Sequence, residues 1–288
     1  TNLVDWSPLA LLQRTNASLD ALSYLEADAA NFDQRFYRTH TNILITPLPK
    51  PSGPYPVGTV SRPLTDPSRI RNTTPPTNSF MVTFWYPAEA RAGTLPDACV
   101  EKEITLVPPP SGAPSYWNNP AIVAKLVSQA HLNLSLASNR ISYPVVIFSH
   151  GMGGHRRQNT DTVIELASHG YIVVGMDHKD AFASVFPGGE IVRGAPGTPC
   201  EQLNTSVVEY RTHDLLFVMD ELIRLNINDV LLAGRLDLER IGLIGKSMGG
   251  MTVAEVGRID PRCKAVVLLD AGYTLEMPPD LIPNGLKK

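Results

Sequence analysis

The stretch Arg240-Ile241-Gly242-Leu243-Ile244-Gly245-Lys246-Ser247-Met248-Gly249-Gly250 decides the fold of this chain. It contains a short apolar strand, a Gly-x-Ser-x-Gly turn at 245–249 and the start of a helix. In such a turn the flanking glycines let strand and helix approach closely, so the serine takes a strained backbone conformation and exposes its Oγ above the sheet. A glycine-rich structural turn is the alternative interpretation, because the pattern alone is short. The strand before it and the helix after it favour Ser247 as a nucleophile.

The sequence on both sides of this turn alternates between short apolar runs and helical spacing. We expect strands at 80–86, 145–148, 171–176, 240–244 and 265–269, and helices at about 119–136, 156–168, 205–225 and 248–258. This alternation predicts a mostly parallel central sheet with helices on both faces, the α/β-hydrolase fold. Residues 47–78 are dense in proline and predict turns and short extended pieces, whereas 181–203 predict a long loop that forms a lid or substrate wall.

The bulk composition limits the class of protein. With 288 residues, 43% apolar and 18% charged, the chain suits one α/β domain over 1–288, with a Pro/Gly-rich part at 1–78 and the sheet core at 79–288. The net charge of −3 offers no basic surplus for binding nucleic acid or an anionic membrane. No apolar run approaches the ~18 residues that a transmembrane helix needs.

A nucleophilic serine needs hydrogen-bond donors for the oxyanion, and this fold supplies two backbone N–H groups. One belongs to the residue after the nucleophile, Met248. The other is expected in the glycine-rich segment His150-Gly151-Met152-Gly153-Gly154, which follows the strand at 145–148, and Met152 is the expected donor. His150 itself is interpreted as a structural residue of this loop and not as the catalytic base.

After Ser247 the sequence contains a candidate for the acid of the triad but no candidate for its base. Asp270 directly follows the strand at 265–269, where a carboxylate points at the site of a parallel sheet. A surface aspartate at the start of a turn is the alternative, and Glu276 and Asp280 are the other candidate acids. The base should follow the acid in sequence, but all seven histidines precede Ser247, at positions 40, 131, 150, 155, 169, 178 and 213. The sequence therefore predicts a triad without its histidine.

Glycosylation sequons and cysteines bear on where the protein works. Four Asn-x-Ser/Thr sequons, together with the absence of an initial Met, predict a secreted, extracellular and processed protein; they begin at Asn16, Asn72, Asn133 and Asn204. A disulfide between Cys99 and Cys200 is an open alternative, since both lie in loops but sequence does not fix their separation. Cys263, at the edge of a strand, is expected to be a small buried residue. No pattern of cysteines and histidines indicates a metal site.

Longer stretches resemble the platelet-activating-factor acetylhydrolase family, in its plasma-type and intracellular type II branch, together with related secreted fungal esterases. The run from 144 to 182 is the most diagnostic, because it is long and lies outside the serine motif. The matching stretches are Gly53-Pro54-Tyr55-Pro56-Val57-Gly58, Val82-Thr83-Phe84-Trp85-Tyr86-Pro87, Phe148-Ser149-His150-Gly151-Met152-Gly153-Gly154, Leu166-Ala167-Ser168-His169-Gly170-Tyr171, Asp177-His178-Lys179-Asp180 and 240–250.

The resemblance implies a set of roles and an activity. Ser247 is then the nucleophile, Asp270 the acid, and Met152 and Met248 the oxyanion donors. The implied reaction is hydrolysis of short-chain carboxylic esters, including sn-2 acetyl or short acyl phospholipids, without a metal or organic cofactor. Lys246 stands where the family usually has a histidine, but that histidine is not the base.

A second departure from the family concerns the segment after the acid. The family continues through another strand and a loop that carries the catalytic histidine, so this chain is expected to lack its C-terminal strand and helix. We expect a C-terminal fragment of the same precursor to supply the histidine, with the pair Lys287-Lys288 as a processing site. Simple absence of that segment is the alternative.

Two further functions stay open at this level. One is a broader secreted carboxylesterase or polyester hydrolase that uses the same triad. The other is a catalytically inert binding protein that keeps the pocket, which the missing histidine favours. The serine turn, the glycine-rich loop and the acid, present together and in order, favour an enzyme.

Overall fold

The computed structural model describes residues 48–70, 73–99, 101, 103–104, 107, 126–194 and 205–271. All of these lie in one compact unit, within Ile45–Lys288.

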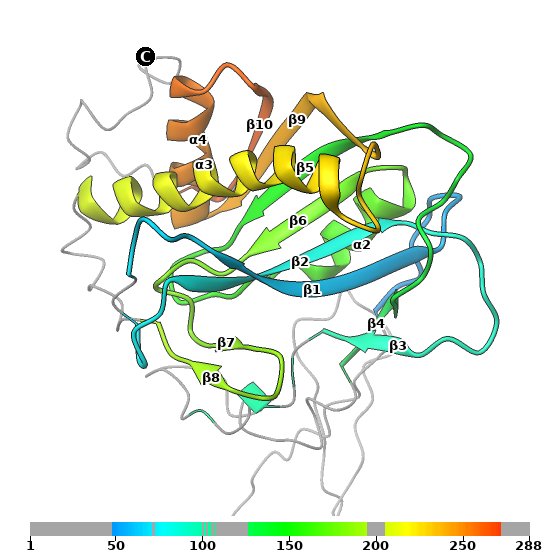
Figure 1. Ribbon diagram of the computed structural model, residues 1–288, viewed down its shortest axis with the longest axis horizontal. Helices are drawn as coiled ribbons and strands as arrows, with labels where there is room; N and C mark the ends of the chain where they lie inside the picture. Colours follow the sequence, from blue (N-terminus) through cyan, green and yellow to red (C-terminus); the bar gives the residue numbers. More distant parts are fainter. Residues whose placement is uncertain are drawn as a thin grey trace, which may run out of the picture. The chain divides into compact units, whose positions relative to one another are not determined.

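A mixed, mostly parallel sheet of eight strands organises this unit (Figure 1). The strands run in the order β10-β9-β5-β6-β2-β1-β4-β3. The half from β10 to β6 is parallel, while β2 is antiparallel to both β6 and β1. The strands are β1 (Val57–Thr65), β2 (Ser79–Pro87), β3 (Pro96–Ala98), β4 (Val127–Leu132), β5 (Tyr143–Ser149), β6 (Ile172–Met176), β9 (Leu236–Lys246) and β10 (Cys263–Leu269).

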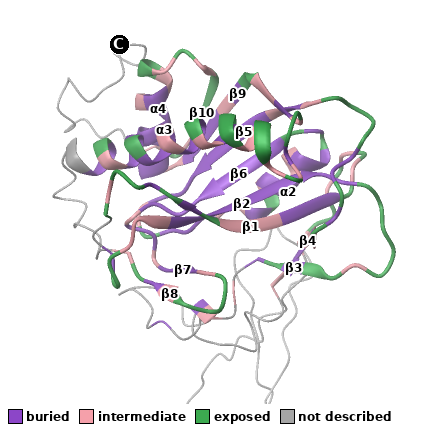
Figure 2. Cartoon of the chain, viewed as in Figure 1, coloured by how far each residue is buried: buried purple, intermediate pink, exposed green. Residues whose placement is uncertain are grey.

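Helices cover both faces of the sheet, because successive residues of β5 pack into two different cores. Val145 and Ile147 pack into one core with residues of α3 (Thr205–Asn228) and α4 (Met248–Ile259), while Val146 and Phe148 pack into another with α2 (Thr160–Ser168). Successive side chains of a strand point to opposite faces, so a continuous apolar run requires cover on both sides. Accordingly, β6 is buried along its whole length, and β2 and β5 are buried at all but one residue each (Figure 2). The predicted α/β fold with a parallel core is confirmed.

The helix expected at about 119–136 is wrong over the described residues from 126 onward. A strand, β4, lies there, parallel to β1 and antiparallel to β3. Its buried residues alternate, with Ser128 and Ala130 facing inward, which is the period of a strand and not of a helix. The pairing partners are at least 29 residues away in sequence, so tertiary contacts override the local preference.

The expected boundaries of the sheet and of the long loop also need correction. The sheet begins at Val57 and not at residue 79, because β1 lies within the proline-rich part. Pro63 is tolerated there because β4 pairs with β1 only at 57–59, so no described strand pairs with β1 on the side of Pro63 that faces away from β2. In the expected loop 181–203, the described part contains a hairpin of β7 (Ser184–Val185) and β8 (Ile191–Val192).

Several expected features lie outside the described residues, namely Asn16, Asn72, Asn204, Cys200, Glu276 and Asp280. Asn133 is exposed and has a positive φ of 55°. Cys99 is buried and has no disulfide partner among the described residues, and burial raises the pKa of its thiol to about 11. Its predicted disulfide with Cys200 stays a prediction. None of the described helices combines the length and the apolar character that crossing a membrane requires.

Candidate active site

Ser247 occupies the sharp turn between β9 and α4. Its backbone has φ 49° and ψ −118°, a conformation that costs a non-glycine residue about 1–3 kcal/mol. Its N–H donates to the Leu269 carbonyl over 2.8 Å, and its own carbonyl accepts from the N–H of Gly250 over 2.8 Å. The neighbouring strand and the first turn of the helix therefore hold this residue in its strained conformation.

Gly245 and Gly249 must be glycine because a Cβ at either position would clash with neighbouring backbone, and not because their φ angles are positive. A Cβ on Gly245 would lie 2.1 Å from the carbonyl oxygen of Gly249. A Cβ on Gly249 would lie 2.1 Å from the carbonyl oxygen of Ser149, at the end of β5. Strand β9, helix α4 and strand β5 therefore meet at a distance that leaves no room for side chains, which is the reason for the Gly-x-Ser-x-Gly pattern.

The glycine-rich loop after β5 lies against the nucleophile. A Cβ on Gly151 would be 3.6 Å from the Cβ of Ser247. The Gly151 N–H is already bound, since it donates to Gln158 Oε1 over 2.8 Å. The N–H groups of Met152 and Met248 have no acceptor among the described residues, and Met248 is the first residue of α4, where helix N–H groups are unpaired. This geometry fits the predicted pair of oxyanion donors.

Asp270 lies at the same edge of the sheet as Ser247. In the parallel pair of β9 and β10, Lys246 is in register with Leu269, so the two residues that follow these strands are neighbours. Asp270 is exposed and, like Ser247, has a positive φ, here 50°. The sequence prediction of an acid beside the nucleophile is consistent with this placement.

Within the described residues no histidine is hydrogen-bonded to Ser247. His150, in the oxyanion loop, is buried and has both ring nitrogens occupied. Nδ1 bonds the Gly151 carbonyl at 2.6 Å, and Nε2 accepts from the N–H of His178 at 3.1 Å. Burial first, and then the charge of Arg211, hold the pKa of His150 well below its usual range. His150 is therefore a neutral structural residue, as the sequence interpretation expected.

The sequence analysis missed a buried Ser–His–Asp chain behind this loop. Ser149 Oγ lies 2.9 Å from His178 Nε2, and His178 Nδ1 lies 3.0 Å from Asp214 Oδ2. The arrangement resembles a catalytic triad, but all three residues are buried and no ester can reach Ser149. Burial lowers the pKa of His178, so its imidazole is neutral. One signal was available in the sequence: Asp214 falls on the apolar face of the helix expected at 205–225.

An apolar cluster forms one wall beside the nucleophile. Met248 and Met251 of α4 pack against Val207 and Val208 at the start of α3, and Met152 of the oxyanion loop joins them. Methionine side chains adapt to ligands of different shape. Among the described residues, no three His, Cys, Asp or Glu side chains converge where they could hold a metal ion.

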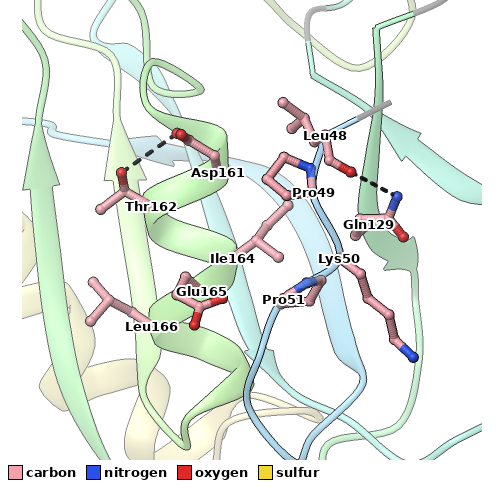
Figure 3. A pocket seen from close by; sticks show the side chains of 10 residues that line it. All are labelled: Leu48, Pro49, Lys50, Pro51, Gln129, Asp161, Thr162, Ile164, Glu165 and Leu166. Atoms are coloured by element: carbon pink, nitrogen blue, oxygen red, sulfur yellow. Dashed lines mark hydrogen bonds between the residues drawn. The ribbon is translucent and has the colours of Figure 1, made fainter. Parts of the chain in front are cut away.

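A pocket of about 420 Å³ lies elsewhere on the molecule (Figure 3). It is formed by α2, one side chain of β4 and the segment 48–51, and none of its residues belongs to the strand ends that carry Ser247, Met152 or Asp270. We therefore do not assign the ester site to it. Its residues are Leu48, Pro49, Lys50, Pro51, Gln129, Asp161, Thr162, Ile164, Glu165 and Leu166.

Comparison with known proteins identifies the family. Residues 44–189, half of the chain, match the family described as platelet-activating factor acetylhydrolase, isoform II. The chain belongs to this family. The matched range ends before β9, so the roles of Ser247 and Asp270 depend on the geometry described above and not on this match.

Relatives of the platelet-activating factor acetylhydrolase family resemble most of the chain. The platelet-activating factor acetylhydrolase of Cavia porcellus is 26% identical over 88% of this chain and 62% of its own length. A probable 1-alkyl-2-acetylglycerophosphocholine esterase of Arthroderma benhamiae is 27% identical over 78% of this chain and 59% of its own. The chain thus spans about six tenths of these two relatives. A ferulic acid esterase from Streptomyces cinnamoneus has a similar structure, with a TM-score of 0.63 and 31% identity over 80% of this chain and 64% of its own.

Proposed function

We propose that the protein is a serine esterase that hydrolyses short-chain carboxylic esters, with sn-2 acetyl or short acyl phospholipids as the preferred class. The observation that carries the proposal is the strained backbone of Ser247, φ 49° and ψ −118°, at the elbow between β9 and α4. A strained backbone conformation lowers the stability of the fold. It is typical of residues that must expose a reactive atom. The names of the relatives in Cavia porcellus and Arthroderma benhamiae support the acetyl phospholipid class.

The reaction follows from the positions of the groups. Ser247 Oγ attacks the ester carbonyl and passes its proton to a base, while the N–H groups of Met152 and Met248 bind the oxyanion. Collapse of the tetrahedral intermediate breaks the bond to the alcohol, which takes that proton from the base. Water, deprotonated by the same base, then hydrolyses the acyl-enzyme. Asp270 orients the base and stabilises its charged form.

We propose that a C-terminal segment of the same precursor supplies this base. The outer edge of β10 pairs with no strand among the described residues, and the side chains of Val266 and Val267 on it are 38% and 46% exposed. Exposed apolar edge strands are usually protected by a partner. A strand added parallel to β10 at this edge would carry the residues after it to the same end of the sheet as Asp270.

A broader carboxylesterase is the second candidate, and one observation favours it. The ferulic acid esterase of Streptomyces cinnamoneus, named for an aromatic acid, is 31% identical to the aligned part of this chain. The adaptable methionines 152, 248 and 251 could accept such an acyl group. A panel of p-nitrophenyl esters from acetyl to feruloyl separates the two, since the first candidate requires a steep decline beyond the shortest chains.

Secretion is also part of the proposal. Asn133 is exposed and carries a sequon, so its side chain is accessible for N-glycosylation. The predicted disulfide between Cys99 and Cys200 belongs to the same environment. Peptide mapping after enzymatic deglycosylation of material from a eukaryotic host checks this, and an unmodified Asn133 in every preparation would speak against it.

The central test is covalent labelling of the serine. A fluorophosphonate probe should react with Ser247, located by mass spectrometry, and the labelled protein should no longer hydrolyse p-nitrophenyl acetate. Absence of both labelling and hydrolysis, in a preparation that contains the complete precursor, would favour the inert binding protein. Intact-mass analysis of the same preparation shows whether a second polypeptide with a histidine is present.

A further inference from the structure

A buried guanidinium lies directly behind the oxyanion loop, the segment 150–154. Arg211 of α3 is fully buried and donates from Nη1 to the His150 carbonyl at 2.7 Å and from Nη2 to the Gly151 carbonyl at 3.4 Å. It also forms a two-pronged ion pair with Asp180, with Nε–Oδ1 at 3.1 Å and Nη2–Oδ2 at 2.5 Å. Apolar replacements of buried ion pairs are often as stable as the pair, so stability alone does not explain this arrangement.

The carbonyl of Gly151 is fixed from several directions. It accepts from His150 Nδ1 at 2.6 Å, from the Gly154 N–H at 3.0 Å and from Arg211 Nη2. In a planar trans peptide the C=O and the following N–H point in opposite directions. Because the Gly151 carbonyl faces the buried Arg211, the N–H of Met152 in the same peptide unit must face away from it. Among the described residues this N–H has no acceptor, so it is available for a ligand.

His150 acts on the same peptide in a defined protonation state. A carbonyl can only accept, so Nδ1 carries the proton that it donates to Gly151, and Nε2 is the acceptor for the His178 N–H. Burial and the nearby Arg211 lower the pKa of His150, which agrees with this neutral tautomer. Burial alone would raise the pKa of Asp180, but the charge of Arg211 outweighs it and lowers that pKa. The carboxylate that holds Arg211 therefore stays ionised.

We infer that Arg211, held by Asp180, is a positioning residue for the oxyanion hole. It touches neither the nucleophile nor the substrate, and acts by fixing the 151–152 peptide so that the Met152 N–H faces the developing oxyanion. A positive charge at the carbonyl end of an amide also polarises it and makes the N–H a stronger donor. The inference rests on the proposed esterase function for its kinetic consequence, but not for its geometry.

Two matched substitutions in the complete precursor test this role. Arg211→Met keeps the bulk of the side chain and removes its donors, whereas Arg156→Met removes an equally buried guanidinium that pairs with Asp177 and binds no carbonyl of 150–154. Loss of one oxyanion donor lowers kcat by about 10²–10³-fold. In Arg211→Met the Met152 N–H is still present but misdirected, so we expect kcat to fall by about 10–100-fold and KM to stay within about threefold of the wild type. Arg156→Met should lower the melting temperature while keeping kcat within about threefold of the wild type.

A second readout does not depend on turnover. In protein labelled with ¹⁵N-methionine, Arg211→Lys, which keeps a charge at the site, should shift the Met152 amide signal and speed its hydrogen exchange, and leave the Met248 signal in place. Unchanged kcat in Arg211→Met, an equal loss of kcat in Arg156→Met, or an unmoved Met152 amide in Arg211→Lys would each overturn the inference. If the wild type hydrolyses no ester, the proposed function fails, while the amide signals still decide the positioning role.

Discussion

At the scale of single residues, two serines of this chain have the neighbours of a catalytic serine, and burial distinguishes them. Ser149 has a histidine and an aspartate in hydrogen-bonded sequence, but it lies inside the sheet. Ser247 lacks a histidine partner among the described residues, yet it has the strained turn, the adjacent oxyanion loop and an acid on the next strand. Access to substrate, and not the identity of the neighbours, decides which serine can react.

This distinction gives a direct prediction. Ser247→Ala should abolish fluorophosphonate labelling and ester hydrolysis with little change in stability, because alanine keeps the Cβ and backbone conformation and the Ser247 hydroxyl caps no helix N–H. Ser149→Ala should keep labelling and lower the free energy of unfolding by about 1 kcal/mol, the typical value of one buried hydrogen bond. Labelling with mass spectrometry and urea unfolding measure the two effects. Labelling at Ser149 in either variant would contradict the assignment.

The carboxylate of Glu101 predicts how stability depends on pH. Burial alone would raise its pKa, but the guanidinium groups of Arg156 and Arg157 outweigh this effect and lower it to about 2. A pKa that is lower in the folded state contributes stability above the unfolded pKa, and this contribution is lost as the pH falls towards the folded value. The contribution of Glu101 should therefore be complete above about pH 4.5 and decline between about pH 4.5 and 2.

Unfolding in urea from pH 6 to pH 3 checks this. Glu101→Gln should be less stable than the wild type at pH 6, because two buried guanidinium groups each lose one of their two carboxylate partners. The difference should narrow below about pH 4.5, as the wild-type carboxyl takes up its proton. A constant difference between the two proteins over this range would show that the charge of Glu101 does not stabilise the fold.

At the scale of elements, the sequence predicted those strands, helices and turns whose conformation depends on residues close to them in the chain. The turn at 245–249, its strand and its helix follow from the glycine spacing and the apolar run, and the structure places them as expected. Strand β4 did not follow, because only its pairing with β1 and β3 makes it a strand. The Arg211–Asp180 pair was missed for the same reason, since its members are 31 residues apart and a buried arginine gives no periodic signal.

The close approach of β9, β5 and α4 predicts unequal effects for two glycines of one strand. Gly245→Ala would place a Cβ 2.1 Å from the Gly249 carbonyl oxygen, which is backbone and cannot move aside. It should lower the free energy of unfolding by about 1–3 kcal/mol or more and disturb the nucleophile. Gly242→Ala meets its nearest atom at 3.8 Å and should change stability by less than about 1 kcal/mol. Equal melting temperatures of the two variants would refute this packing argument.

At the scale of the whole described unit, three parallel strands bring the site together. β5 leads to the oxyanion loop, β9 to Ser247 and β10 to Asp270, all at one edge of the sheet, so topology joins residues that lie up to 120 positions apart. No residue of the described strands is placed to act as the base for Ser247. The outer edge of β10, which pairs with no described strand, is where we propose that the C-terminal segment docks.

A charged side chain on the outer edge of β10 tests whether a strand docks there. Val267 on β10 is 46% exposed, so Val267→Arg should leave the fold intact while placing an unpaired charge where the proposed C-terminal strand docks. Val230→Arg, at a fully exposed site that follows α3, is the control for adding a charge. A side chain the size of valine contributes about 1.5–3 kcal/mol when buried, so Val267→Arg should weaken docking and slow fluorophosphonate labelling by at least about tenfold. Val230→Arg should react at the wild-type rate. If Val267→Arg also reacts at that rate, the base does not arrive along β10, and Ser247 must be activated from another direction.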